Sequence, residues 1–207
     1  MPRRTKEEAE QTRAEILTAA LDLFSTKGYS KTTFDDIAKA INMTKGAIYW
    51  HFRNKPDLLA GLIQVNCESK VLAILNAMPL IRSLEELKEF FVCNAKDIAS
   101  DARYRTFLFF VFFQMEWSDT LFMRIRNTIN FIRDFPMKHL KDSLTVIQKS
   151  GELSPETDLD ALTVIVIGIW KGLLSSYIGK EFDFNLPEMV SRAFDILIRG
   201  LKNNENR

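Results

Sequence analysis

The sequence predicts an all-α protein of about nine helices. Only eight glycines and six prolines are spread over 207 residues, so turns must be few and regular elements long. Hydrophobic residues make up 46% of the chain and charged residues 27%, a balance typical of a soluble globular protein with a substantial core. Apolar residues also recur along the chain at the three- and four-residue spacing of a helix face.

The first two helices are expected near the N-terminus. Thr5 can cap the first helix, whose apolar stripe continues until Gly28 stops it. Thr32 or Thr33 can cap a second, short helix that ends near Asn42, a residue that tolerates positive φ.

A third helix completes a recognisable motif. Thr44 can cap it, and Ala47, Ile48 and Phe52 give it an apolar side. Two short helices joined by about three residues, the second of them amphipathic, form the layout of a helix-turn-helix.

The rest of the chain is expected to form six longer helices. Asn54 can cap the first of these, with Pro56 in its first turn, and Ser83 with Glu86 makes a capping box for the next. Pro136 interrupts a long helical pattern, which it should kink or divide. The six helices are expected at residues 54–76, 83–99, 102–114, 118–149, 159–178 and 187–201.

Cysteines and histidines are too few for a metal or catalytic centre. Cys67 and Cys93 lack CxxC spacing, and together with His51 and His139 they do not supply a zinc site. Because the chain also shows no Ser/His/Asp arrangement and no phosphate loop, neither an enzyme nor a bound cofactor is expected. Glutamates interrupt the basic N-terminus, and the run FLFFVFF is too short to span a bilayer, so a cytoplasmic protein is expected.

The stretch TKGAIYWHFRNK, residues 44–55, places more contact-forming side chains on one helix than a core can bury. In a helix-turn-helix the second helix enters the major groove, where hydroxyl, ammonium and ring N–H groups meet phosphates and base edges. The residues expected to bind DNA on this ground are Thr44, Lys45, Gly46, Ala47, Tyr49, Trp50, His51 and Lys55. The alternative is an ordinary amphipathic helix whose aromatic side chains plug a neighbouring helix.

The charge distribution adds little to the choice between a DNA-binding helix and an ordinary amphipathic helix. Residues 1–55 carry ten Lys/Arg against seven Asp/Glu, and the remaining residues carry eighteen against twenty. An excess of three positive charges fits a polyanionic partner but is weak support by itself.

The segment GYSKTTFDDIAKAINMTKGAIYWHFRNKPDLL, Gly28 to Leu59, resembles the signature of TetR-family regulators. GAIYWHF and the opening RRTKEEA are particularly similar to multidrug-efflux repressors of the AcrR and TtgR type. The resemblance implies a DNA-binding domain at residues 1–54 and a ligand-binding and dimerisation domain at residues 55–207. It also adds Thr33 to the residues expected to contact DNA.

Two positions depart from the family pattern. Ile41-Asn42 replaces the usual Ala-Gly at the turn, but asparagine can adopt the same backbone conformation. Phe34 stands where some relatives keep a phosphate-binding threonine.

Nine of the sixteen phenylalanines fall within about forty residues of the C-terminal part. Phe109, Phe110, Phe112 and Phe113 surround the expected sixth helix, which should therefore be buried on every side. A filled core and a lipophilic ligand site both fit this composition. TetR-like proteins bind small effectors in this region, so the resemblance implies a pocket lined by Phe90, Phe91, Asn94, Leu108, Phe112, Leu140, Ile167, Trp170 and Leu174.

Small residues follow one side of the expected eighth helix. A ridge of this kind lets two helices approach closely, either inside one subunit or between subunits. Because similar proteins dimerise through their last two helices, we expect a twofold homodimer whose interface includes Gly168, Gly172, Ser176, Ala193 and Gly200.

Together these expectations describe a ligand-responsive transcriptional repressor. It should bind a palindromic operator as a homodimer, control an efflux or transporter operon and be released by a lipophilic small molecule. The alternative is a DNA-bound activator or non-inducible regulator of the same fold, whose aromatic interior is only core. An all-α enzyme acting on lipophilic substrates is a remote alternative.

Overall fold

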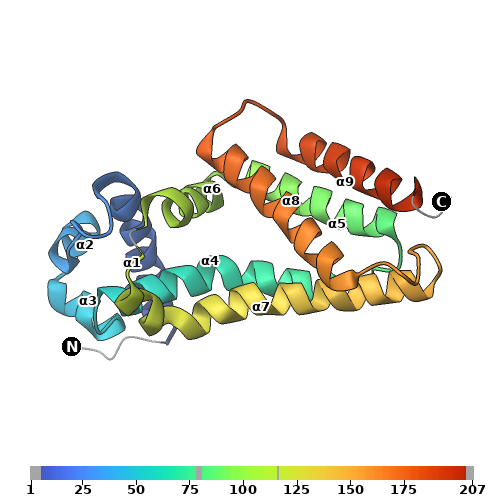
Figure 1. The fold of residues 1–207 in the computed structure, drawn as a ribbon. Coiled ribbons are helices and arrows are strands. Elements are labelled where there is room, and N and C mark those ends of the chain that lie inside the picture. Colours follow the sequence, from blue (N-terminus) through green and yellow to red (C-terminus); the bar gives the residue numbers. More distant parts are fainter. Residues whose placement is uncertain (1–5, 78–80, 116, 204–207) are drawn as a thin grey trace. The chain divides into compact units, whose positions relative to one another are not determined.

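All the secondary structure in the described part of the chain is helical (Figure 1). The computed structural model describes residues 6–77, 81–115 and 117–203, which form nine α-helices and one π-helical segment, η2. The predicted all-α class is therefore confirmed. The elements are α1 (Lys6–Lys27), α2 (Phe34–Ala40), α3 (Lys45–His51), α4 (Lys55–Ala77), α5 (Leu84–Ser100), α6 (Ala102–Phe109), η2 (Phe110–Gln114), α7 (Asp119–Lys149), α8 (Leu159–Gly179) and α9 (Leu186–Asn203).

The predicted capping residues set the starts of several helices. Thr33, Thr44 and Ser83 are the N-caps of α2, α3 and α5, and each side-chain oxygen accepts the backbone N–H three residues later. Asn54 Oδ1 likewise accepts the backbone N–H of residue 57 at 2.9 Å, at the start of α4. Thr5, the expected cap of α1, lies outside the described residues.

The chain packs as two compact units. The first comprises the described parts of Met1–Cys67 and Thr106–Ile129, and the second those of Glu68–Arg105 and Asn130–Arg207. Helices α4, α6 and α7 contribute to both units. The expected domain division between residues 54 and 55 stays a prediction, because compact packing and a functional boundary are different properties.

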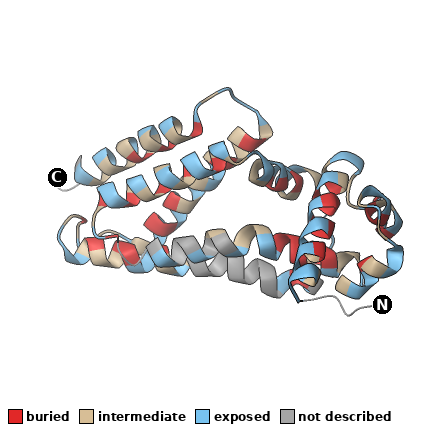
Figure 2. Cartoon of the chain, turned by 180° about the vertical axis from the view of Figure 1, so that it is seen from behind, coloured by how far each residue is buried: buried red, intermediate tan, exposed pale blue. Residues whose placement is uncertain are grey.

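The first unit has its core on one face of α1. Buried and exposed positions alternate along this helix (Figure 2). Ile16, Ala20 and Phe24 repeat at four-residue spacing and have no exposed surface. The Phe24 ring stacks on Phe110 of η2, with centroids 5.5 Å apart, so α1 is joined to the π-helical segment.

The second unit is organised by the packing of α5 against α9 and α8. The Phe91 ring of α5 lies 4.9 Å from that of Phe194 in α9 and 5.3 Å from that of Trp170 in α8, measured between centroids. Lys88 of α5 also forms an ion pair with Asp195 of α9 at 2.9 Å. Aromatic contacts and an ion pair therefore hold the same two helices.

The expected sixth helix, residues 102–114, ends in a π-helical turn, and the prediction that its phenylalanines are buried on every side is wrong. Phe110 is fully buried against α1, whereas Phe109, Phe112 and Phe113 are 37%, 45% and 44% exposed. The spacing of the four rings correctly indicated an aromatic helix. It could not show that, in the described chain, neighbouring helices cover only one side of that helix.

Helix α7 is not divided at Pro136, so of the two expected outcomes, a kink or a division, the division is wrong. Helical backbone continues from Asp119 to Lys149. Proline removes one backbone N–H and crowds the preceding turn, which can bend a helix without ending it. A kink at Pro136 stays a prediction.

Helix α8 is long and apolar enough to cross a membrane, judged by length and composition alone. Only 28% of its most apolar stretch is buried within the described chain. Lys171 and Lys180 make this segment more polar than a typical membrane span, so we expect α8 to pack against protein, and this stays a prediction.

Gly61 lies where α4 comes close to Arg13 and Phe52. A Cβ atom at Gly61 would stand 2.9 Å from Arg13 Nη2 and 3.0 Å from Phe52 Cε1. Gly61→Ala should therefore lower the free energy of unfolding by about 1–3 kcal/mol, measured by urea denaturation. Gly46→Ala is the matched control, since its Cβ would meet nothing nearer than Thr44 Oγ1 at 3.8 Å. Equal stability of Gly61→Ala and the natural protein would contradict this close packing.

Candidate nucleic-acid interface

Helices α2 and α3 form a helix-turn-helix whose turn contains a residue with positive φ. Asn42 has a φ of 53°, in the left-handed region that asparagine tolerates better than most residues. The Met43 N–H donates to the Ala38 carbonyl at 2.8 Å and closes the end of α2. The departure from the family's usual glycine therefore leaves the turn intact.

Helix α3 has one buried face and one exposed face. Ile48 and Phe52, four residues apart, are only 0% and 1% exposed and fix the helix to the core. Tyr49 and Trp50 are 52% and 72% exposed. The Tyr49 ring packs edge-on against the Phe34 ring, with centroids 5.0 Å apart. This contact holds the Tyr49 ring in place but leaves much of it exposed to solvent. Trp50 therefore does not plug a neighbouring helix in the described chain, whereas Tyr49 contacts α2 with part of its ring and leaves the rest exposed.

The first turn of α3 is open. Among the described residues, only Thr44 Oγ1 would lie within 4 Å of a Cβ atom on Gly46, so packing there does not require glycine. Lys45 is half exposed, and its Nζ lies 3.1 Å from Asp35 Oδ2 on α2. The hydrogen bond and the charge of Asp35 raise the pKa of Lys45, so the ammonium stays protonated. The turn thus offers a cation beside accessible backbone.

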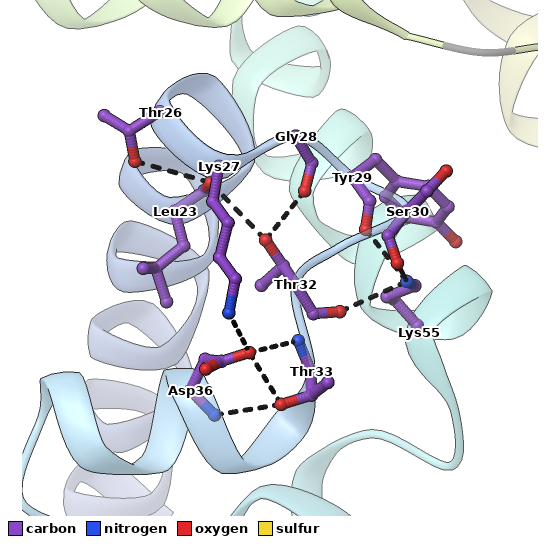
Figure 3. Close-up of polar contacts among 10 residues, drawn as sticks. All are labelled: Leu23, Thr26, Lys27, Gly28, Tyr29, Ser30, Thr32, Thr33, Asp36 and Lys55. Atoms are coloured by element: carbon purple, nitrogen blue, oxygen red, sulfur yellow. Dashed lines mark hydrogen bonds and ion pairs between the residues drawn. The ribbon is translucent and has the colours of Figure 1, made fainter.

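A polar network fixes α2 behind this turn (Figure 3). The Thr33 hydroxyl donates to Asp36 Oδ2 at 2.7 Å and accepts the Asp36 N–H at 3.2 Å. Lys27 Nζ lies 2.8 Å from the same carboxylate oxygen. Hydrogen bonds from Lys27 and then Thr33 hold the pKa of Asp36 well below its usual range. A phosphate contact by the Thr33 hydroxyl would compete with this network.

The ammonium of Lys55 lies in a cage of backbone carbonyls (Figure 3). Its Nζ donates to the carbonyls of Tyr29 at 2.8 Å, Ser30 at 3.1 Å and Thr32 at 3.1 Å, and it lies 4.5 Å from the centroid of the Tyr29 ring. Burial lowers the pKa of Lys55. Since an ammonium has three N–H donors, a phosphate could bind Lys55 only by displacing a carbonyl.

Most of the residues predicted to bind DNA therefore share one short helix and its cap. His51 is half-buried, with its ring 4.6 Å from that of Trp50, and Ala47 is also half-buried. Thr33 and Lys55 lie outside α3, and intramolecular contacts occupy their polar groups, as Asp35 also does for the ammonium of Lys45. No local sequence pattern signals the Lys55 cage, since its carbonyls lie 23 to 26 residues earlier in the chain. The DNA contacts themselves stay predictions.

The residues predicted to line a ligand pocket are divided between the two units. Leu108 is buried and Phe112 is exposed in the first unit, whereas the other seven belong to the second. Asn94 Nδ2 donates to the Phe90 carbonyl at 2.8 Å, so its amide is held within α5. The members placed in the second unit are Phe90, Phe91, Asn94, Leu140, Ile167, Trp170 and Leu174.

Within the second unit, Phe91 contacts both Phe90 and Trp170, whereas Leu140 and Leu174 are buried core residues. Phe194 of α9 joins this aromatic cluster and was not predicted. Its spacing of four residues from the buried Val190 could have indicated it. The pocket stays a prediction.

The small residues predicted for a dimer interface lie on open helix faces. Cβ atoms added to Gly168, Gly172 and Gly200 would have no atom of the described residues within 4 Å. Packing among the described residues therefore does not require these glycines, and the dimer interface stays a prediction. Ala193 is half-buried, and the hydroxyl of Ser176 donates to Glu181 at 3.0 Å. The exposed apolar residues on the same two helices are Val164, Ile165 and Ile196.

Two protein-family descriptions match the chain. Residues 16–62 match "Bacterial regulatory proteins, tetR family", and residues 82–203 match "MAATS-type transcriptional repressor, C-terminal region". The first match contains the helix-turn-helix, and the second contains α5 to α9.

Named relatives agree with these matches. The probable acrEF/envCD operon repressor of Escherichia coli K12 is 30% identical over 208 residues, covering 100% of this chain and 94% of the relative. The transcriptional regulator TtgR of Pseudomonas putida is 52% identical over 63 residues, 30% of each chain. The crystal structure of NalD, the secondary repressor of the MexAB-OprM multidrug efflux pump in Pseudomonas aeruginosa, has a TM-score of 0.81 and 22% identity, covering 95% of this chain and 98% of NalD.

The Lys55 cage predicts a role in stability. Lys55→Met keeps the aliphatic stem but leaves three carbonyls without their donor, so the free energy of unfolding should fall by about 1–3 kcal/mol in urea denaturation. Lys39→Met, at an exposed lysine of α2, is the control and should change stability by less than about 0.5 kcal/mol. Equal effects of the two changes would show that the cage does not stabilise the fold.

Proposed function

Because the chain belongs to the TetR family of bacterial regulatory proteins, which are transcriptional regulators and not enzymes, we propose that it represses an efflux or transporter operon. In this proposal it binds a palindromic operator in the cytoplasm and leaves it when a lipophilic small molecule binds. One observation carries the proposal most directly. Tyr49 and Trp50 are exposed on the helix-turn-helix face that also presents Lys45.

The chemistry of this face suits duplex DNA. A tyrosine hydroxyl, an indole N–H and an ammonium can donate to phosphates and to base edges. Gly46 leaves the backbone of the first turn accessible, and packing among the described residues does not require a glycine at this position. The N-terminus of a helix also favours phosphate, because its first N–H groups lack partners within the helix.

A dimer would give the operator its symmetry. TetR-family regulators typically act as dimers, and here the open glycines and exposed apolar side chains of α8 and α9 support a twofold interface. Two recognition helices related by a twofold axis read half-sites about 34–36 Å apart, one turn of DNA. A palindromic operator follows from that geometry.

A lipophilic effector suits the aromatic content of the chain. Phe91, Trp170 and Phe194 form a ring cluster among α5, α8 and α9. The similar Escherichia coli protein is named a probable repressor of the acrEF/envCD operon. NalD, whose structure is similar, is named the secondary repressor of a multidrug efflux pump. By analogy, this chain would control the export of apolar compounds that it also senses.

Release from DNA would be a shift between two conformers. Helix α4 starts beside the helix-turn-helix and continues into the second unit, so it can transmit a change. A second route is available within the first unit, where Gln114 Nε2 of η2 donates to the Ser25 carbonyl of α1 at 3.0 Å. The effector can shift the equilibrium only by its difference in affinity for the two conformers.

The salt dependence of DNA binding tests the proposed contact by Lys45. Each phosphate contact contributes about 0.9 to the slope of log affinity against log salt, so Lys45→Gln should lower that slope by about one per contact and weaken binding. Fluorescence anisotropy with an operator selected from random DNA measures both quantities. Lys96→Gln removes an exposed charge from α5 and should leave the slope unchanged. An unaltered slope in Lys45→Gln would reject the contact.

A bulky side chain introduced into α8 tests the proposed dimer interface. Gly172→Leu places a large side chain on the open ridge of α8 and should produce monomers in sedimentation velocity. Ala14→Leu, which adds the same side chain to an exposed position of α1, should remain dimeric. A dimer that survives Gly172→Leu at the same protein concentration would place the interface elsewhere.

A further inference from the structure

An acidic residue of α2 holds the cation of the candidate interface. Asp35 lies in the first turn of α2, and its Oδ2 is 3.1 Å from Lys45 Nζ in the first turn of α3. The two side chains are 54% and 50% exposed, and Lys45 begins the helix whose exposed side chains include Tyr49 and Trp50. Asp35 therefore places a negative charge where a polyanion is expected to bind.

The fold does not need Asp35 as a cap. The neighbouring carboxylate, Asp36, forms the capping box with Thr33 and the ion pair with Lys27. Any acidic side chain in this turn would interact favourably with the α2 dipole. The particular consequence of aspartate at position 35 is its contact with Lys45.

This contact opposes DNA binding in two ways. A phosphate oxygen that displaced Asp35 would have to break a formed ion pair. A phosphate that shared the ammonium instead would bring its own charge within about 6 Å of the Asp35 carboxylate, if each hydrogen bond is about 3 Å long. Like charges at that separation repel, most strongly at low ionic strength.

We propose that Asp35 is an affinity-setting residue, which competes with DNA phosphates for Lys45 and so weakens binding to every duplex. This inference rests on the proposed function, because it requires Lys45 to contact DNA. The loss of DNA affinity caused by Asp35 does not depend on base sequence. It therefore makes stable binding depend on the additional contacts that only an operator supplies to the exposed face of α3.

Asp35→Asn tests the competition directly. At low salt, the variant should bind both a selected operator and a duplex of random sequence about two- to fivefold more tightly per recognition helix, the range expected for one exposed ion pair. The gain should shrink as salt is added. Asp35→Ser, which is also well tolerated at the start of a helix, should behave in the same way, and circular dichroism checks that both variants fold.

A double-variant cycle separates competition from general charge repulsion. In a Lys45→Gln background, Asp35→Asn should have no effect on affinity if Asp35 acts through Lys45. An equal gain in both backgrounds would show simple repulsion and overturn the inference. Glu15→Gln, which removes an exposed carboxylate from α1, should give little gain in either background.

The remaining outcomes are also decisive. Weaker binding by Asp35→Asn would mean that Asp35 orients Lys45 for DNA, which is the opposite role. Unchanged binding by Asp35→Asn, with Lys45→Gln weakened, would overturn the competition and leave the proposed function standing. Failure of the natural protein to bind any duplex would overturn the proposed function and this inference together.

Discussion

The burial of Ile48 and Phe52 is the constraint on which the candidate interface depends. Helix α3 has only seven residues, and a helix that short is not stable alone in water. Its position comes from these two buried side chains and from the Thr44 cap. Because Ile48 faces the core, Trp50, about 200° further around the helix, projects into solvent, and Tyr49, about 100° away, lies at the flank with its ring partly against Phe34. The hydrophobic core thus determines which side chains can meet a partner.

The basic residues around this helix have different tasks, which burial and partners distinguish. Lys55 is desolvated inside a carbonyl cage, and Lys27 is paired with a capping carboxylate, so both hold the scaffold. Arg13 lies over the Phe52 ring, 4.7 Å from its centroid, and supports the same anchor. Lys45 lies at the start of α3 with a half-exposed side chain, and its partner Asp35 is itself exposed and does not cap a helix. Charge by itself therefore does not identify a DNA contact.

Local rules predicted most of the fold. Thr33 and Thr44 cap helices as expected, and Asn42 takes the predicted positive φ, because each effect involves residues within one turn. The Lys55 cage and the one-sided burial around η2 could not be predicted, because both depend on which distant segments become neighbours. Nor did the single proline at position 136 end α7, which continues from Asp119 to Lys149.

The central claim is that the exposed face of α3 lies against DNA in the bound state. The most direct measurement is acrylamide quenching of Trp50 fluorescence in a chain whose other tryptophans, Trp117 and Trp170, are replaced by phenylalanine. With 72% of its surface exposed, Trp50 should be quenched strongly in the free protein and protected when a selected operator duplex is added. Equal quenching of Trp50 with and without saturating operator would contradict the account.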